Sequence, residues 1–214
     1  MTDRLSLYNG ALRILGERRL SSLTENRSPR RQLDDIWNDS FVDRCLEQGQ
    51  WNFAMRAIEL AASDVVTPTF GYDYAFEMPT DWIKTAGVSL SETFDPPLVG
   101  NGYKEEVGYW LANSTPLYVR YISNDSQYGG DLNRWPQSFT EFAKALLAME
   151  AGPVITSSVS RVDRATKLAY QLRLEARSND AMNEPTAFPP EGGWNSSRAG
   201  GRGGDRGSRS RLIG

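Results

Sequence analysis

The feature that most constrains this chain is a change in the spacing of its apolar residues, from helical at both ends to strand-like in the middle. In residues 3–15 the apolar side chains recur every three or four positions, and Gly16 is well placed to cap the end of a helix. Ser28 followed by Pro29 is typical of a helix start, with the serine as N-cap. We therefore predict a second helix from this pair to about Gln48.

The middle of the chain has the pattern of short strands. Residues 74–90 and 108–122 alternate bulky and small side chains and are rich in tyrosine and tryptophan, as strands often are. The Asn-Gly pair within residues 99–103 is a specific hairpin signal between strand-like runs. Residues 53–60 are ambiguous between helix and strand. We predict an antiparallel sheet in this part of the chain.

Helical spacing returns after the middle region. One helix is predicted to open at Trp135 and to end near Gly152, where a proline follows, and another is predicted from Val159 to Ala176. The predicted fold is α+β: a four-helix bundle made of N- and C-terminal helix pairs, an inserted antiparallel β-sheet region and an extended arm. The expected boundaries are residues 1–54 and 135–178 for the bundle, 55–134 for the insertion and 179–214 for the arm.

The composition argues against an enzyme. Histidine is absent, and Cys45 is the one cysteine. Because histidine is the commonest general base and the commonest transition-metal ligand, its absence excludes Ser-His-Asp and Cys-His catalysis and most zinc sites. Carboxylate, lysine and magnesium chemistry remain open. We expect no enzyme and no cofactor, and we expect Cys45 to be a small buried apolar residue.

No membrane location is expected either. The chain has no run of eighteen apolar residues, so no transmembrane helix is predicted. Residues 1–4 lead into an amphipathic segment rather than into the apolar stretch of a signal peptide. These features favour a protein that is made and used in the cytosol, or in a particle assembled there.

Charge is unevenly distributed along the chain. The formal net charge is −3, yet residues 192–214 contain five arginines and one aspartate, so residues 1–191 carry the remaining −7. An acidic body with a basic tail indicates two surfaces with different partners.

The residues that most resemble a catalytic or metal-binding site are three carboxylates in the second predicted helix. Asp35, Asp39 and Asp43 are spaced to lie along one helix face. Three carboxylates could meet a divalent cation, as a metal-dependent enzyme would require. They could equally form a solvated face, or line a polar channel. We favour a face without metal.

The tail after residue 178 loses all periodicity and becomes rich in glycine and arginine, a composition that cannot bury enough surface to fold alone. Two interpretations stay open: a basic docking arm for an acidic protein surface, with two apolar residues as a hook, or a nucleic-acid-binding segment. The residues concerned are Trp194, Arg198, Arg202, Arg206, Arg209, Arg211, Leu212 and Ile213.

Several short pieces, taken in order, resemble one family. They are Tyr8-Asn9 with Leu12-Arg13-Ile14-Leu15-Gly16-Glu17, then Leu20-Ser21-Ser22-Leu23-Thr24-Glu25, Gly49-Gln50-Trp51-Asn52-Phe53-Ala54, Met78-Pro79-Thr80-Asp81-Trp82, Tyr118-Val119-Arg120-Tyr121-Ile122 and Trp135-Pro136-Gln137-Ser138-Phe139. Over residues 5–178 the chain resembles the tail tubular protein A family, the head-to-tail adaptors, or gatekeepers, of short-tailed bacteriophages.

This resemblance implies a structural protein of the virion at the head-to-tail junction. It implies a homo-oligomeric ring, commonly a dodecamer, that lies under the portal protein and above the tail nozzle protein and surrounds the channel for double-stranded DNA. The helical part would pack side by side around this channel. No catalytic residue belongs to the family pattern. Repulsion of phosphate by the acidic residues of the second helix would let DNA slide through such a channel.

Overall fold

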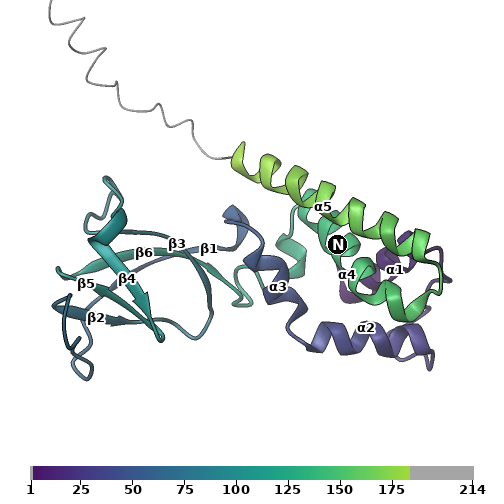
Figure 1. Ribbon diagram of the computed structural model, residues 1–214, viewed down its shortest axis with the longest axis horizontal. Coiled ribbons are helices and arrows are strands. Elements are labelled where there is room, and N and C mark those ends of the chain that lie inside the picture. Colours follow the sequence, from purple (N-terminus) through teal and green to yellow (C-terminus); the bar gives the residue numbers. More distant parts are fainter. Residues whose placement is uncertain (1, 184–214) are drawn as a thin grey trace, which may run out of the picture. The chain divides into compact units, whose positions relative to one another are not determined.

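The computed structural model describes residues 2–183, which form an α+β fold: helices from both ends of this segment lie together, and the strands from its middle form two small antiparallel sheets beside them (Figure 1). The α-helices are α1 (Arg4–Leu15), α2 (Ser28–Asn38), α3 (Phe41–Glu47), α4 (Gln137–Ile155) and α5 (Val159–Ala181). The strands are β1 (Met55–Leu60), β2 (Tyr74–Glu77), β3 (Trp82–Ser89), β4 (Tyr103–Glu106), β5 (Tyr109–Ala112) and β6 (Leu117–Ser123).

The first helix forms as its local sequence predicts. Asp3 is the N-cap and accepts a hydrogen bond from the Ser6 backbone N–H, while the Ser6 hydroxyl closes the reciprocal half of a capping box. Gly16 adopts a left-handed conformation with φ 72°, and its N–H donates back to the last turn. The buried face of α1 carries Leu7, Tyr8, Ala11, Leu12 and Leu15.

The prediction of one helix from Ser28 to Gln48 is wrong, because the chain breaks between α2 and α3. Asp39 ends α2, and Ser40 takes a left-handed backbone with φ 53° before α3 begins. Asn38, Asp39 and Ser40 are all weak helix formers, so a break here costs little intrinsic helix stability. Ser28 is also the first residue of α2 rather than its N-cap.

The two C-terminal helices run further than predicted. Helix α4 passes through Pro153 and ends at Ile155, where the Thr156 N–H donates to the Gly152 carbonyl at 2.9 Å. Helix α5 continues past the predicted boundary at residue 178 to Ala181, because tertiary contacts hold its last turn.

Each sheet has three antiparallel strands. One has the order β1-β6-β3 and the other the order β2-β5-β4. The predicted strands in residues 74–90 and 108–122 are therefore confirmed, and the ambiguous residues 53–60 contribute the end of a short 3-10 turn and strand β1. The predicted hairpin at Asn101-Gly102 is wrong: Gly100–Gly102 forms a 3-10 turn that leads into β4.

The hairpin lies instead between β4 and β5. Val107 and Gly108 form its turn with φ values of 41° and 83°, the two positive values that a type I′ turn needs. A β-branched residue at positive φ is strained, so the sequence contains no signal for a turn here.

The core has two clusters of buried side chains. The larger lies among the helices, centred on α4, which contacts all four other helices, and it extends to Ile122 of β6 and to Trp51 and Trp135. The smaller lies between the two sheets, where Phe76 and Trp110 of one sheet meet Val88, Val119 and Tyr121 of the other. Five helices are present in residues 2–183, so the predicted four-helix bundle is not confirmed.

Candidate functional site

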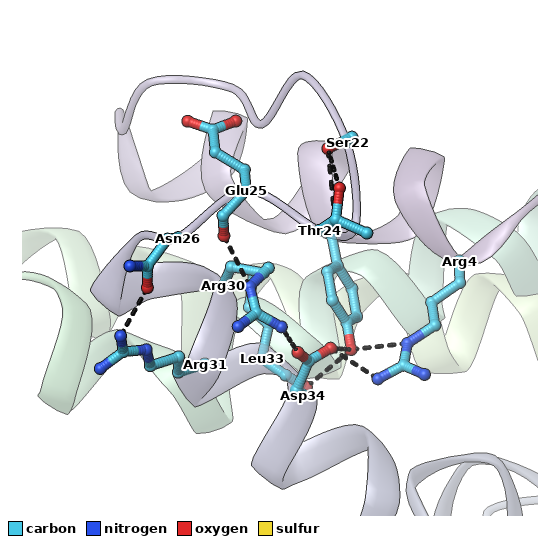
Figure 2. Close-up of polar contacts among 10 residues, drawn as sticks. Arg4, Ser22, Thr24, Glu25, Asn26, Arg30, Arg31, Leu33 and Asp34 are labelled. Carbon is cyan, nitrogen blue, oxygen red and sulfur yellow. Dashed lines mark hydrogen bonds and ion pairs between the residues drawn. The ribbon is translucent and has the colours of Figure 1, made fainter.

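A partly buried polar network joins α1 to α2, as Figure 2 shows. The Asp34 carboxylate lies between two guanidinium groups, with Arg4 Nη2 at 2.6 Å on one oxygen and Arg30 on the other. The Tyr8 hydroxyl donates toward Asp34 Oδ1 at 2.9 Å and accepts from Arg4 Nε at 2.8 Å. Burial raises the pKa of the Tyr8 hydroxyl far above its ordinary value, so it stays protonated and keeps donating.

Several residues of the motifs that carry the family resemblance make hydrogen bonds that hold elements of this fold together. Asn9 accepts from the Leu20 N–H at 2.7 Å and donates to the Leu20 carbonyl at 3.1 Å, which fixes the loop after α1. Asn52 donates from its backbone N–H to Asp180 Oδ2 at 2.9 Å and from its amide to the Asp180 carbonyl at 3.0 Å. This pair holds the end of α5 against the start of the β region.

The two motif tryptophans are buried and tied to backbone. Trp51 Nε1 donates to the Leu46 carbonyl at 3.0 Å, and Trp135 Nε1 donates to the Gly129 carbonyl at 2.8 Å. Both rings meet Phe139 edge-on, with ring centroids 4.7 Å apart in each case. Such aromatic pairs contribute about 0.5–1.5 kcal/mol beyond their burial. They explain why Trp-x-Phe and Trp-Pro occur where the helices meet the sheet.

Asp81, another motif residue, ties together all three strands of the β1-β6-β3 sheet. It precedes β3 and accepts from Arg56 Nη1 of β1 at 2.9 Å, from the Tyr121 hydroxyl of β6 at 3.1 Å, and from Ser123 Oγ. Burial acts to raise the pKa of this carboxyl, but the three donors outweigh it, and the pKa lies below its usual value. The geometry is that of a structural clasp, since every oxygen is already bonded.

The three carboxylates predicted to share a helix face do not do so. Asp35 lies exposed on α2, Asp39 is the residue that ends α2, and Asp43 lies on α3 beyond the break. Asp39 pairs with Arg44 at 3.1 Å, and Asp43 accepts from Asn124 Nδ2 at 2.9 Å. Spacing of four residues places side chains on one face only within an unbroken helix, and here the helix breaks at Asp39 and Ser40.

The described residues contain no group of three or more carboxylate, cysteine or histidine side chains placed to hold a metal ion. No helix within residues 2–183 has the length and apolar character needed to cross a membrane. Cys45 is fully buried, as predicted, and burial raises the pKa of its thiol well above the usual value, which leaves the thiol unreactive.

The predicted docking arm lies outside the described residues. This applies to the whole set of Trp194, Arg198, Arg202, Arg206, Arg209, Arg211, Leu212 and Ile213. The acidic charge that would complement it is concentrated in one region: residues 55–134 contain eleven Asp and Glu against five Lys and Arg, a net −6 of the −7 carried by residues 1–191. The predicted second helix lies within residues 1–54, which contain eight acidic and eight basic side chains and therefore add no net charge to the acidic body.

One apolar surface lies on α5. Tyr170 and Leu174, one turn apart, are 56% and 62% exposed, and Val159, three turns earlier on the same side, is 73% exposed. The buried Ala165, Ala169 and Ala176 lie on a different side of the helix. We call these three exposed residues the α5 face. Large apolar side chains that gather on one face of a helix mark an interaction surface more often than isolated ones do.

A second apolar surface lies in the β region. A hollow of about 400 Å³ is enclosed by residues 66–72 and by side chains of β4 and β5, including Leu111. Phe70 and Val107 line it and are 87% and 98% exposed. Val107 has a positive φ of 41° at this point, a strained conformation for a β-branched residue. We call this feature the β-region hollow.

The sequence pattern misses the two surfaces for different reasons. The helical periodicity of residues 159–176 places Val159 on the core face, although it is exposed, and Val107 has no turn signature. No protein-family model matches the chain, and no curated protein sequence is similar to it.

Proposed function

We propose that this protein is a structural head-to-tail adaptor of a short-tailed bacteriophage, which assembles as a ring around the DNA channel between the portal protein and the tail nozzle protein. It would act in the virion at the head-to-tail junction. Its activity would be mechanical and structural, with no chemical step to assign to any residue.

One observation supports this proposal most directly: the chain leaves two apolar surfaces uncovered, one on a helix and one in the β region. The α5 face and the β-region hollow are built from different elements, since the first lies on α5 and the second is formed by residues 66–72 with β4 and β5. A protein that links two neighbours needs at least two interfaces, and a head-to-tail ring contact joins two different surfaces of the same subunit. The order of the family-like motifs agrees with this interpretation.

The clasps made by the motif residues also support an adaptor. Asn9, Asn52, Asp81 and Trp135 each fix a junction between elements. Rigid junctions suit a part that transmits force between a head and a tail. We further propose that Asp35 and Asp39, whose side chains are exposed, contribute to a channel wall that repels DNA phosphate. Asp43 suits this role less, since Asn124 holds it.

Native mass spectrometry tests the proposal, on the full chain alone and after mixing with the portal protein of the same phage. We expect a closed ring in at least one of the two samples. A ring that forms only with the portal would indicate assembly on a template. A chain that stays a single copy in both samples contradicts the adaptor function, and nucleic-acid binding through the arginine-rich tail would then become the leading alternative.

A further inference from the structure

A basic hollow lies between α1, the loop that follows α1, and α4. It has a volume of about 270 Å³ and is lined by Ser6, Asn9, Gly10, Arg13, Arg19 and Lys144. Three of its six residues are cationic, and none is an acid. This hollow belongs to neither apolar surface described above and has no part in the proposed adaptor function.

The position of Lys144 is set by the absence of a side chain at Gly10. A Cβ built at Gly10 would lie 2.5 Å from Lys144 Cδ and 2.6 Å from its Cγ, so the aliphatic stem of the lysine lies in the notch that glycine leaves. The Lys144 side chain is only 15% exposed. Its ammonium group ends 2.8 Å from Glu141 Oε1. The lysine is therefore held in place rather than free to sweep through solvent.

The position of Arg19 is set by the Asn9 clamp. Both hydrogen bonds of the Asn9 amide go to the backbone of Leu20, the residue that follows Arg19, and they are 2.7 and 3.1 Å long. The Arg19 carbonyl also accepts from Arg27 Nη1 at 3.2 Å. The backbone that bears Arg19 is thus anchored at two points, while among residues 2–183 its guanidinium has no recorded ion pair.

The surroundings add positive charge. Residues 13–31 contain six arginines and two glutamates. The Glu141 carboxylate is shared between Lys144 at 2.8 Å and Arg13 at 3.8 Å. One carboxylate facing three cations leaves a net positive hollow. Phosphate is the biological anion whose several oxygens can accept from two guanidinium groups and an ammonium group together.

We propose that this hollow binds a phosphate group, with Arg13, Arg19 and Lys144 as its donors; a DNA backbone and inorganic phosphate are the two sources that the experiments below distinguish. Arg13 and Arg19 would contact the phosphate oxygens directly, and Lys144 would supply charge from beneath them. The inference does not rest on the proposed adaptor function, because a ring that fails to form would leave these side chains where they are.

Binding of a fluorescently labelled DNA duplex to the full-length chain, followed by anisotropy over a series of salt concentrations, tests this site. We expect the double variant Arg13→Gln and Arg19→Gln to weaken binding about tenfold and to reduce the slope of log K against log salt by about 2, one for each lost contact. The control Arg164→Gln and Lys167→Gln removes the same charge from exposed positions of α5 and should leave the slope nearly unchanged. Circular dichroism confirms that each variant is folded.

A second comparison separates the hollow from the tail. Arg202→Gln with Arg206→Gln removes equal charge from the arginine-rich segment. If that variant abolishes duplex binding and the hollow variant does not alter it, the hollow is not a DNA site. Equal losses in the hollow variant and the α5 control would also overturn the proposal, since net charge alone would explain them.

Inorganic phosphate distinguishes the source of the ligand. Isothermal titration of the full chain with inorganic phosphate, at constant ionic strength, is compared with titration of the hollow variant. Phosphate binding that is lost in the variant, without any duplex binding, would identify a site for a free anion and refute DNA as the source. If neither phosphate nor duplex distinguishes the variant from the wild-type chain, the hollow binds no phosphate.

Discussion

Tyr8 is fully buried, and its hydroxyl completes the network around Asp34. In a Tyr8→Phe variant, Asp34 loses one donor and Arg4 Nε loses its acceptor. Because hydrogen bonds to charged groups contribute about 1.5–3 kcal/mol, we expect the free energy of unfolding in urea to fall by about 2 kcal/mol. Tyr170→Phe is the matched control, because that ring is 56% exposed on α5, and it should change stability by less than about 0.5 kcal/mol. Equal effects of the two variants would contradict a role for the network.

The contribution of Asp81 to the stability of the fold depends on pH. Its pKa in the folded chain lies below the usual value, so its ionised form stabilises the fold above the unfolded pKa of about 3.9, and this contribution is lost as the pH falls through the lower folded pKa. We therefore expect the Asp81→Asn variant to be less stable at neutral pH and to lose less stability than the wild-type chain below about pH 4.

Urea unfolding at a series of pH values measures this effect. Asp73→Asn is a suitable control, because Asp73 is exposed and its side chain has no hydrogen bond or ion pair recorded among residues 2–183. The control should follow the wild-type curve. An Asp81→Asn curve parallel to wild type at all pH values would show that the clasp does not depend on the charge of Asp81.

At the scale of elements, the break between α2 and α3 depends on the backbone of Ser40. This residue is exposed, has φ 53° and makes no side-chain cap bond. A left-handed conformation costs a residue with a Cβ about 1–2 kcal/mol, whereas glycine adopts it freely. We expect Ser40→Gly to raise the free energy of unfolding by about 0.5–1 kcal/mol. Ser40→Ala keeps the Cβ and should give no gain; a gain in alanine as large as in glycine would rule out backbone strain as the cause.

The two short sheets show how elements depend on one another. Strand β4 is exposed along most of its length and pairs with β5 alone, so its place is set by the Val107-Gly108 turn and by Tyr103 packing on the smaller core cluster. The clasp at Asp81 performs the same task for the other sheet, where a single carboxylate joins residues of β1 and β6 to the start of β3. Each three-stranded sheet is thus held by one local feature, the Val107-Gly108 turn or the Asp81 clasp, and by the smaller core cluster between the two sheets.

At the scale of the whole molecule, the α5 face is expected to mediate assembly. Tyr170→Ser combined with Leu174→Ser removes two large apolar side chains from an exposed face and leaves the core untouched. We expect this variant to shift native mass from ring to single copies, with a dissociation constant raised at least about tenfold, because apolar interface residues of this size contribute 1–2 kcal/mol or more each.

The control for that experiment lies on the same helix. Gln171→Ser with Glu175→Ser has the same spacing and changes exposed polar side chains one position further along α5. It should leave the mass distribution unchanged. If both variants dissociate the ring to the same degree, α5 matters for its helical stability and not for a specific apolar contact.

Features that depend on residues close together in the chain can be predicted from the amino-acid sequence. The ends of α1 follow from Asp3 and Gly16, and four of the strands follow from alternation of side chains. The buried state of Cys45 followed from its place in a helical pattern. Local backbone preference and side-chain period are enough for such features, since both act over a few residues.

The remaining features depend on contacts between elements that are distant in the sequence. Asp34 could not be told from its neighbour Asp35 by spacing, and it differs because Arg4 lies 30 positions away in the chain yet 2.6 Å away in space. Periodicity shows which residues share a face, but not which face is covered by another element. That is why the exposed state of Val159, the break at Ser40 and the basic hollow at Gly10 emerged only from the packing of elements distant in sequence.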